Sequence, residues 1–383
     1  MNKHILKSLM VLAFTPLFLS LTALATETYS PAETPSISHT IVAGDSLVSL
    51  AIGYLDDAYA WRQIKKINTI KNPRHLKIGS EIKIPDVALG IVTTGYVHGD
   101  VLANIPKTSA TQAVSIGDTF TEGSKFSVGA NSYLSLQLAD GSTVRVLQDS
   151  TMQVKKLREV THDANKSKKI NRVLQLDRGN LDVSVTKNAD AKSNTFEVIT
   201  PKAVAAVRGT RFNVTVTETQ SMSSGVTEGT VDVSKSLPVN APVTIANEHV
   251  ALNAGLGVVV SASGQLGDVR HLLLAPEITS IENVESRAGD MLINWSKVTG
   301  AGNYQLRIAN DTKMEQVLQN LVAADAEASI KGLALGEYTL GIRAVDPDGL
   351  IGYEATKTFQ VIKKEPVKVE EMAPMNSFIN KPK

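Results

Sequence analysis

Residues 200–214, TPKAVAAVRGTRFNV, determine how the larger part of this sequence is interpreted. A run of small apolar residues ends in Arg208-Gly209-Thr210-Arg211, and a strand-type alternation of apolar and polar residues begins at Phe212. We expect Gly209 to adopt a backbone conformation that other residues resist, which would turn the chain sharply before that strand. The stretch is therefore predicted to be a corner of the fold.

The two arginines of this stretch have different predicted roles. Arg208 carries five donors in a rigid fork, so we expect it to clamp turn carbonyls or a carboxylate such as Asp177 or Glu228. Arg211 precedes the core-facing Phe212, so it is predicted to point outward and is the better candidate for a contact with another molecule.

The surrounding segment, residues 87–265, has a β pattern throughout. The run SYLSLQLADGSTVRVL (132–147) alternates on both sides of Asp140-Gly141, which predicts a hairpin. The same reasoning predicts turns at Asp177–Asn180 and at Glu228-Gly229. The charged stretch 155–171 is interpreted as a solvated loop; a basic patch for an anionic polymer is the alternative. Short strands with glycine turns predict an all-β domain, closed or solenoid-like.

The order of motifs in this segment resembles a FecR domain. The matching runs are GDTFTEG (117–123), LADGS (138–142), DRGNLDV (177–183), FEVITP (196–201), VRGTRFNV (207–214) and EGTVDV (228–233). The resemblance implies that Arg208, Gly209 and Thr210 form a structural motif that accompanies the fold rather than one chemistry.

A shorter segment, residues 38–85, has the pattern strand–helix–helix–strand. Asp45 or Ser46 is predicted to cap a first helix, whose apolar stripe consists of Leu47, Leu50, Ala51 and Tyr54. A second helix carries Trp61, Ile64 and Ile67 on one face. The outer strands are predicted at Thr40-Ile41-Val42 and over Ile78, Ile82 and Ile84.

This segment resembles a LysM domain through the run IVAGDSLVSLA (41–51), Asn68, Asn72-Pro73 and LKIGSEIKIP (76–85). The resemblance implies binding of a polymer that contains N-acetylglucosamine, such as peptidoglycan or chitin. The sugar would lie between two loops, Gly44-Asp45-Ser46 and Ile70-Lys71-Asn72. Short polar loops offer backbone groups to an acetamido group, and Ile70 offers an apolar surface to its methyl group.

A third unit, residues 276–362, consists of regular short strands with a tryptophan early and a tyrosine late, which predicts a β-sandwich. The run LALGEYTLGIRAVD (333–346) makes it similar to a fibronectin type III domain. The resemblance implies that Tyr338 occupies a corner position with its hydroxyl bonded to the backbone, and Trp295 is expected in the core.

The ends of the chain are predicted to lie outside the folded units. Residues 1–25 have two lysines, an apolar run and an Ala23-Leu24-Ala25 cleavage pattern, which predicts a secretory signal peptide; an uncleaved membrane anchor is the alternative. A flexible leader (26–37) and a disordered tail (363–383) are also expected. Removal of the two lysines changes the formal charge from +1 to −1, which gives no reason to expect nucleic-acid binding.

The functional prediction is a non-enzymatic protein of the periplasm or cell envelope. The sequence has no cysteine and no local zinc, serine-nucleophile or dinucleotide motif, so no catalytic, metal or cofactor site is predicted. The LysM-like unit is expected to bind peptidoglycan, and the β-domains to present surfaces to an envelope protein or polymer. Two alternatives stay open: a periplasmic signalling component related to FecR-type regulators, and an unrecognised cell-wall glycan hydrolase.

Overall fold

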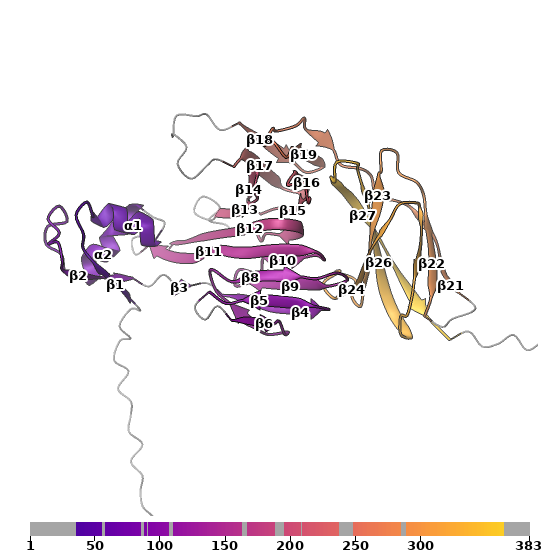
Figure 1. Ribbon diagram of the computed structural model, residues 1–383, viewed down its shortest axis with the longest axis horizontal. Helices are drawn as coiled ribbons and strands as arrows, with labels where there is room; N and C mark the ends of the chain where they lie inside the picture. The colour runs from indigo at the N-terminus through magenta and orange to yellow at the C-terminus, as the bar shows by residue number, and fades with distance from the viewer. Residues whose placement is uncertain are drawn as a thin grey trace, which may run out of the picture. The chain divides into compact units, whose positions relative to one another are not determined.

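The computed structural model describes residues 36–55, 58–85, 88–89, 91–106, 110–162, 167–187, 195–207, 209–236, 248–284 and 289–363 (Figure 1). The predicted signal peptide, nearly all of the predicted leader and tail, and Arg208 lie outside these residues. Within them, no helix has the length and apolar character needed to cross a membrane. The protein is mainly β, with two short α-helices near the N-terminal end.

The N-terminal unit pairs two strands beside two helices. Its elements are β1 (Ser36–Thr40), α1 (Leu47–Leu55), the 3₁₀ turn η1 (Ala58–Ala60), α2 (Trp61–Ile67) and β2 (Glu81–Pro85). β1 runs antiparallel to β2, and a core of nine buried residues fills the unit: Ile41, Leu47, Leu50, Ala51, Leu55, Ala60, Ile64, Ile82 and Ile84. The first strand begins earlier than predicted, within the expected leader, and Ile78 is 65% exposed outside the closing strand.

Helix α1 begins with a reciprocal pair of serines. The Ser49 backbone N–H donates to Ser46 Oγ at 3.0 Å, and the Ser46 N–H donates to Ser49 Oγ at 2.9 Å. Two of the backbone donors that a helix start leaves unpaired are thereby satisfied. Of the two predicted caps, Ser46 is therefore the one used.

The central β-domain is a closed set of ladders arranged as two facing sheets. The first sheet contains, in order, β6 (Thr111–Ala113), β5 (Val101–Asn104), β8 (Lys125–Val128), β11 (Ser150–His162), β12 (Ser167–Ser184), β13 (Thr195–Ile199), β14 (Ala203–Val207), β17 (Thr230–Lys235) and β18 (His249–Asn253); β3 (Ala88–Leu89) pairs with β11. The second contains β7 (Thr119–Phe120), β4 (Val92–His98), β9 (Tyr133–Leu138), β10 (Thr143–Val146), β12, β15 (Arg211–Val216), β16 (Met222–Glu228), β19 (Leu256–Val260) and β20 (Arg270–His271).

Strand β12 belongs to both sheets, and the predicted turn at Asp177–Asn180 is wrong. The chain stays in one strand there: residues up to Arg178 pair with β11, and Gly179 onward pairs with β15. Gly179 has φ +95°, and a Cβ on it would lie 2.5 Å from the Cα of Ser150. Only glycine fits a left-handed bend this close to a neighbouring backbone, so the glycine marks a crossing between sheets.

The motif around Gly209 is a second crossing. Gly209 has φ +61° and lies between β14 of the first sheet and β15 of the second, so the predicted corner is confirmed. Thr210 is buried, and its carbonyl accepts the Val185 N–H at 2.8 Å. A Cβ on Gly229 would lie 2.9 Å from the Gly209 carbonyl oxygen, so the two glycines pack together. Gly229 separates β16 of the second sheet from β17 of the first and is also not a hairpin turn.

The predicted clamp by Arg208 stays a prediction, because Arg208 lies outside the described residues. Glu228 pairs with Arg211 at 3.1 Å and Asp177 with Lys125 at 2.9 Å. Arg211 is exposed, as predicted.

The stretch 155–171 is not a loop at its described ends, because β11 extends to His162 and β12 begins at Ser167. The hairpin at Asp140-Gly141 is confirmed by the pairing of β9 with β10.

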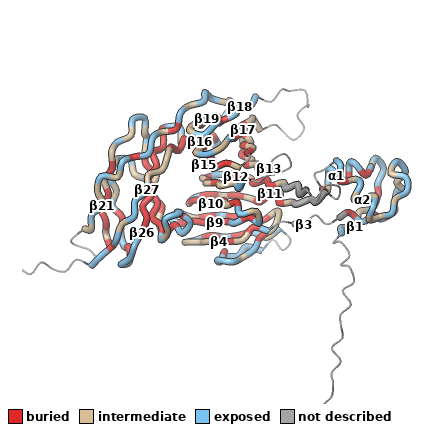
Figure 2. The backbone as a smooth tube through the Cα atoms, turned by 180° about the vertical axis from the view of Figure 1, so that it is seen from behind, coloured by how far each residue is buried: buried red, intermediate tan, exposed pale blue. Residues whose placement is uncertain are grey.

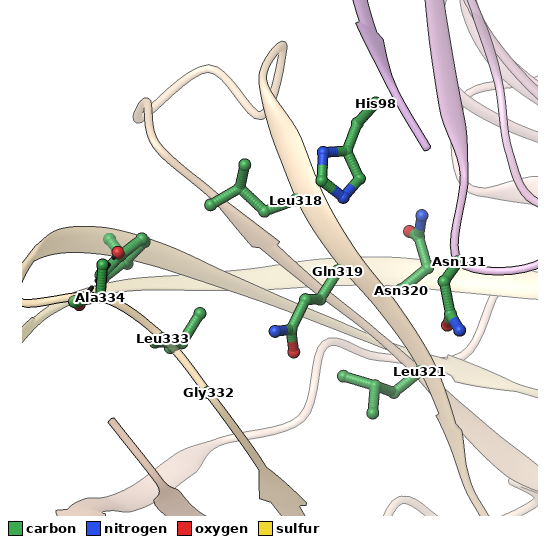
Figure 3. A pocket seen from close by; sticks show the side chains of 10 residues that line it. His98, Asn131, Leu318, Gln319, Asn320, Leu321, Gly332, Leu333 and Ala334 are labelled. Atoms are coloured by element: carbon green, nitrogen blue, oxygen red, sulfur yellow. Dashed lines mark hydrogen bonds between the residues drawn. The ribbon is translucent and has the colours of Figure 1, made fainter. Parts of the chain in front are cut away.

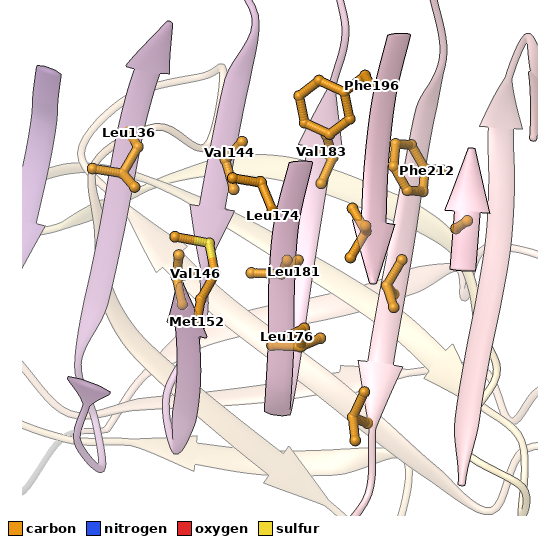
Figure 4. Packing of buried hydrophobic residues seen from close by; sticks show 14 of the residues in the cluster. Leu136, Val144, Val146, Met152, Leu174, Leu176, Leu181, Val183, Phe196 and Phe212 are labelled. Atoms are coloured by element: carbon orange, nitrogen blue, oxygen red, sulfur yellow. The ribbon is translucent and has the colours of Figure 1, made fainter. Parts of the chain in front are cut away.

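The core of the β-domain lies between its two sheets. One cluster of 34 buried residues draws side chains from both sheets, including Leu136 and Val144 of the second and Leu174 and Val198 of the first (Figure 4). Alternation along each strand sends every second side chain inward, as in β14, whose burial alternates at each residue. The apolar pattern of the sequence thus predicts the core more reliably than the turns.

The C-terminal unit is a seven-strand sandwich. One sheet contains β21 (Ile278–Asn283), β22 (Met291–Trp295) and β25 (Glu327–Ile330); the other contains β24 (Val317–Ala323), β23 (Asn303–Ala309), β26 (Gly336–Val345) and β27 (Ile351–Val361). Figure 2 shows the long buried run of β26. Trp295 is buried against Tyr304, and the Tyr338 hydroxyl donates to the Ala334 carbonyl at 3.0 Å. Both predictions for this unit are confirmed.

A buried ionic cluster joins β12 to the sandwich. Asp182 accepts from Arg307 at 2.7 Å and from Arg343 at 2.8 Å, and Arg307 also binds Glu354 at 2.5 Å. Nearby, the Tyr133 hydroxyl donates to the Met314 carbonyl at 3.3 Å. Burial raises the pKa of Asp182, but the guanidinium groups of Arg343 and Arg307 outweigh burial and lower it to about 2. Asp182 is therefore ionised at neutral pH.

Candidate functional site

A cleft in the N-terminal unit lies between the loop after β1 and the loop before β2. Its volume is about 390 Å³. The residues that line it come from both loops: Ile41, Val42, Gly44, Asp45, Arg74, His75, Leu76, Lys77 and Ile78. A cleft of this size fits one or two sugar rings and is within the usual range of small-ligand sites.

The first loop is held in place by a chain of hydrogen bonds. Asp45 Oδ2 accepts the Val42 backbone N–H at 2.8 Å and lies 2.9 Å from His39 Nε2. Because a carboxylate only accepts, the imidazole donates through Nε2, and in the neutral ring Nδ1 accepts from the Tyr54 hydroxyl at 2.8 Å. The network connects β1, the loop and α1 and uses the Val42 N–H, so Val42 offers the cleft its exposed side chain.

Asp45 stays ionised in this network. The hydrogen bond from His39 and then that from the Val42 N–H hold its pKa below the usual range of a carboxyl group. Gly44, with φ +95°, allows the tight turn that brings the carboxylate back to Val42. Asp45 therefore shapes the loop and does not cap α1, which Ser46 does.

The second loop differs from the prediction in which residues reach the cleft. Asn72 organises a turn: its Oδ1 accepts the Arg74 N–H at 3.0 Å and its Nδ2 donates to His75 Nδ1 at 2.9 Å. Ile70 packs against the unit's core, and Lys71 is exposed away from the lining. The cleft is lined by residues 74–78 instead. The structure thus brings Gly44 and Asp45 to the cleft, but not Ser46, Ile70, Lys71 or Asn72.

Two exposed apolar side chains face the two sides of this cleft. Val42 is 56% exposed and Ile78 is 65% exposed. An apolar side chain on each loop, next to the exposed side chains of Arg74 and Lys77, suits a ligand that has both apolar and hydrogen-bonding faces. Sequence reasoning missed Ile78 because it was assigned to the closing strand. The turn signal Gly79-Ser80 directly after it could have placed it in the loop.

A larger groove of about 510 Å³ lies where the β-domain meets the sandwich (Figure 3). His98 and Asn131 line it from the β-domain, and the edge strand β24 lines it from the sandwich. Gln319 in this groove donates to the Lys331 carbonyl at 3.1 Å, so one of its polar groups already serves the sandwich. The LysM-like cleft, with cationic and apolar side chains directed at open space, is the better candidate site.

The described residues contain no group of three or more His, Asp or Glu side chains placed to hold a metal ion. The two His–Asp contacts within them, His39–Asp45 and His249–Asp232, lie on different units. His39 serves the loop as described, and His249 is exposed beside β17.

Comparison with known families identifies two parts of the chain. Residues 39–85 match the LysM domain, and residues 124–232 match the FecR protein family. Both kinds of domain are typically non-catalytic and indicate a location in the cell envelope. No curated protein matches the chain.

Among solved structures, the chain is similar to a "putative anti-sigma factor" from Parabacteroides distasonis ATCC 8503, at 21% identity and a TM-score of 0.29. The similarity covers 38% of this chain, which spans 59% of the length of that one. Another match, FN3tt, has 18% identity and a TM-score of 0.20 over 23% of this chain and 95% of that one. The FN1-FN3 domains of chicken CNTN1 match at 10% identity, with a TM-score of 0.22, over 61% and 96% of the two chains. The chain carries a LysM domain and a FecR domain, followed by a fibronectin type III-like sandwich.

Proposed function

We propose that this protein binds the N-acetylated glycan of peptidoglycan through the cleft of its LysM domain, in the periplasm or cell envelope, and acts without catalysis. The observation that carries the proposal is the cleft itself, which combines a fixed polar loop with the exposed side chains of Val42 and Ile78. An acetamido group presents one donor, one acceptor and a methyl group. The Val42 N–H and carbonyl both bond to Asp45, so the Gly44 backbone and the exposed side chains of Arg74 and Lys77 match the polar part. The two apolar side chains match the methyl group.

The affinity of such a site is modest. The cleft is shallow and is lined by nine residues, so few contacts are made per sugar. We expect dissociation constants in the micromolar to millimolar range, or about −4 to −8 kcal/mol. The FecR domain and the sandwich would then present their surfaces to an envelope protein or polymer that the LysM domain brings near.

Co-sedimentation of the full chain with purified peptidoglycan tests the proposal. An Ile78→Asn variant should bind about three- to tenfold more weakly, because it removes an apolar contact at the cleft without opening a cavity in the core. Ile52→Asn is the matched control, since Ile52 is 51% exposed on α1 and does not line the cleft. Equal binding by both variants and the unmodified chain would refute the site.

The supernatant of the same experiment separates binding from hydrolysis. Retention of the protein on the polymer without release of soluble sugar fragments supports a binder. Release of fragments that grows with time and enzyme concentration would show a hydrolase instead, and would overturn the non-catalytic part of the proposal.

A further inference from the structure

The LysM domain carries an excess of positive charge that the rest of the chain does not share. Residues 39–85 contain seven lysines and arginines but four aspartates and glutamates, whereas the whole chain has 39 and 38. A local excess of one sign on a small unit raises the local concentration of ligands of the opposite sign.

Two of these cations, Arg74 and Lys77, line the glycan cleft. Both are exposed, and neither forms an ion pair with any residue of the described part of the chain. The one acidic residue that lines the cleft is Asp45, whose Oδ2 already accepts hydrogen bonds from His39 and Val42. The cleft therefore offers two free positive charges and no free negative one.

Hydrogen bonds fix the backbone from which these two side chains extend. The N–H of Arg74 is bound by Asn72 Oδ1, and the carbonyl of Lys77 accepts from the Ser80 N–H at 3.1 Å and from its hydroxyl at 2.6 Å. Lys77 directly precedes the exposed apolar Ile78. Ile78 can therefore contact a sugar ring while the adjacent Lys77 contacts a charged substituent of that ring.

Building on the proposed function, we infer that Arg74 and Lys77 make the cleft select an anionic N-acetylated glycan over a neutral one. Chitin oligomers carry acetamido groups but no charge. Peptidoglycan carries carboxylates beside its acetamido groups, either on the lactyl ether of the muramyl sugar or on the attached peptide. A guanidinium or ammonium group on the cleft wall forms charge-assisted hydrogen bonds with such a carboxylate.

The test is titration of the full chain by calorimetry with three soluble probes of equal sugar number. The first is a neutral N-acetylglucosamine tetramer, the second a peptide-free peptidoglycan tetrasaccharide, and the third the same tetrasaccharide with its peptides. The unmodified chain should bind one or both anionic probes about three- to tenfold more tightly than the neutral one at low salt. The second and third probes distinguish the lactyl carboxylate from peptide carboxylates as the group recognised.

An Arg74→Gln/Lys77→Gln double variant should lose that preference and bind the anionic and neutral probes with equal affinity. Lys65→Gln is the control, because Lys65 lies on α2 and does not line the cleft. Raising the salt concentration should reduce the preference of the unmodified chain for anionic probes. The double variant should show no preference at either salt concentration.

The outcomes separate this inference from the proposed function. Equal affinity of the unmodified chain for neutral and anionic probes would overturn the inference and leave glycan binding intact. A preference that survives in the double variant would show that Arg74 and Lys77 do not cause it. Failure to bind any of the three probes would instead refute the proposed function.

Discussion

Asp182→Asn should strongly destabilise the joined FecR domain and sandwich. The substitution removes the charge that faces Arg307 and Arg343, which are 3% and 5% exposed. Removing one partner of a buried ion pair typically costs about 3–5 kcal/mol, because the remaining charge is left buried without compensation. Arg307 keeps Glu354, and Arg343 keeps Gln305. We therefore expect the lower end, about 3 kcal/mol of unfolding free energy.

Asp177→Asn on the same strand is the matched control. Its ion pair with Lys125 has a similar length, 2.9 Å, but the two side chains are 31% and 46% exposed. Exposed pairs of this kind contribute about 1 kcal/mol or less. Urea unfolding followed by the fluorescence of the chain's two tryptophans, of which Trp295 is buried in the sandwich, measures both variants. Equal losses for the two variants would refute the assignment of Asp182 as the ionic link.

The pH dependence gives an independent measurement of the same cluster. The pKa of Asp182 is lowered to about 2 in the folded chain, below its ordinary value of 3.8, so its contribution is present above about pH 4 and is lost as the pH falls toward 2. A shift of this size corresponds to about 2 kcal/mol. Between pH 7 and pH 2.5 the stability gap between the unmodified chain and Asp182→Asn should narrow by most of that amount. A gap that does not change with pH would contradict the charge-based explanation.

Three further substitutions test other parts of the structure. Gly179→Ala should lower the melting temperature more than Gly117→Ala, since both glycines have positive φ but only Gly179 lies against a neighbouring backbone. The expected difference in unfolding free energy is about 1–3 kcal/mol. Equal melting temperatures would contradict the crossing at Gly179. Tyr54→Phe removes the hydroxyl that binds His39 and should weaken glycan binding about two- to fivefold, because the loop is held less firmly. The same calorimetry measures the affinity. An unchanged affinity would show that the Tyr54 hydroxyl does not position the loop. Tyr338→Phe should cost about 1 kcal/mol in urea unfolding and leave glycan affinity unchanged, and a loss of glycan affinity would contradict a role confined to the sandwich.

The sequence predicted the class and order of the units, because alternation of apolar residues reports which side of a strand is buried. Phe212, Val214 and Val216 are all buried, as their spacing predicts. The hairpin at Asp140-Gly141 was also predictable, since its flanking strands pair directly. Gly179 and Gly229 were not, because a glycine with positive φ looks the same in sequence whether the chain folds back in one sheet or crosses to another.

Of the residues predicted for the glycan site, Gly44 and Asp45 line the cleft, whereas those of the second loop do not. Gly44 and Asp45 reach the cleft because the connection between β1 and α1 is short and allows the chain few conformations. The second loop is longer, and its Asn72 side chain binds Arg74 and His75, which brings residues 74–78 to the cleft. Hydrogen bonds of this local kind depend on the conformation of the loop, so residue spacing alone does not reveal them.

The location of the glycines explains why the most distinctive motif of this chain lies away from the proposed glycan site. Gly209 and Gly229 touch each other where the chain passes between the sheets, and the neighbouring Thr210 is buried. A side chain at Gly209 would collide with Lys187, and one at Gly229 would collide with Thr210 and the Gly209 carbonyl, so both positions need glycine for packing. The residues that reach solvent with unpaired charge or apolar surface, Arg74 and Ile78, stand instead in a loop of the smaller LysM domain. The glycine motif of the FecR domain is therefore explained by packing between strands. The residues proposed to contact a ligand are exposed loop residues that the packing of the fold does not require.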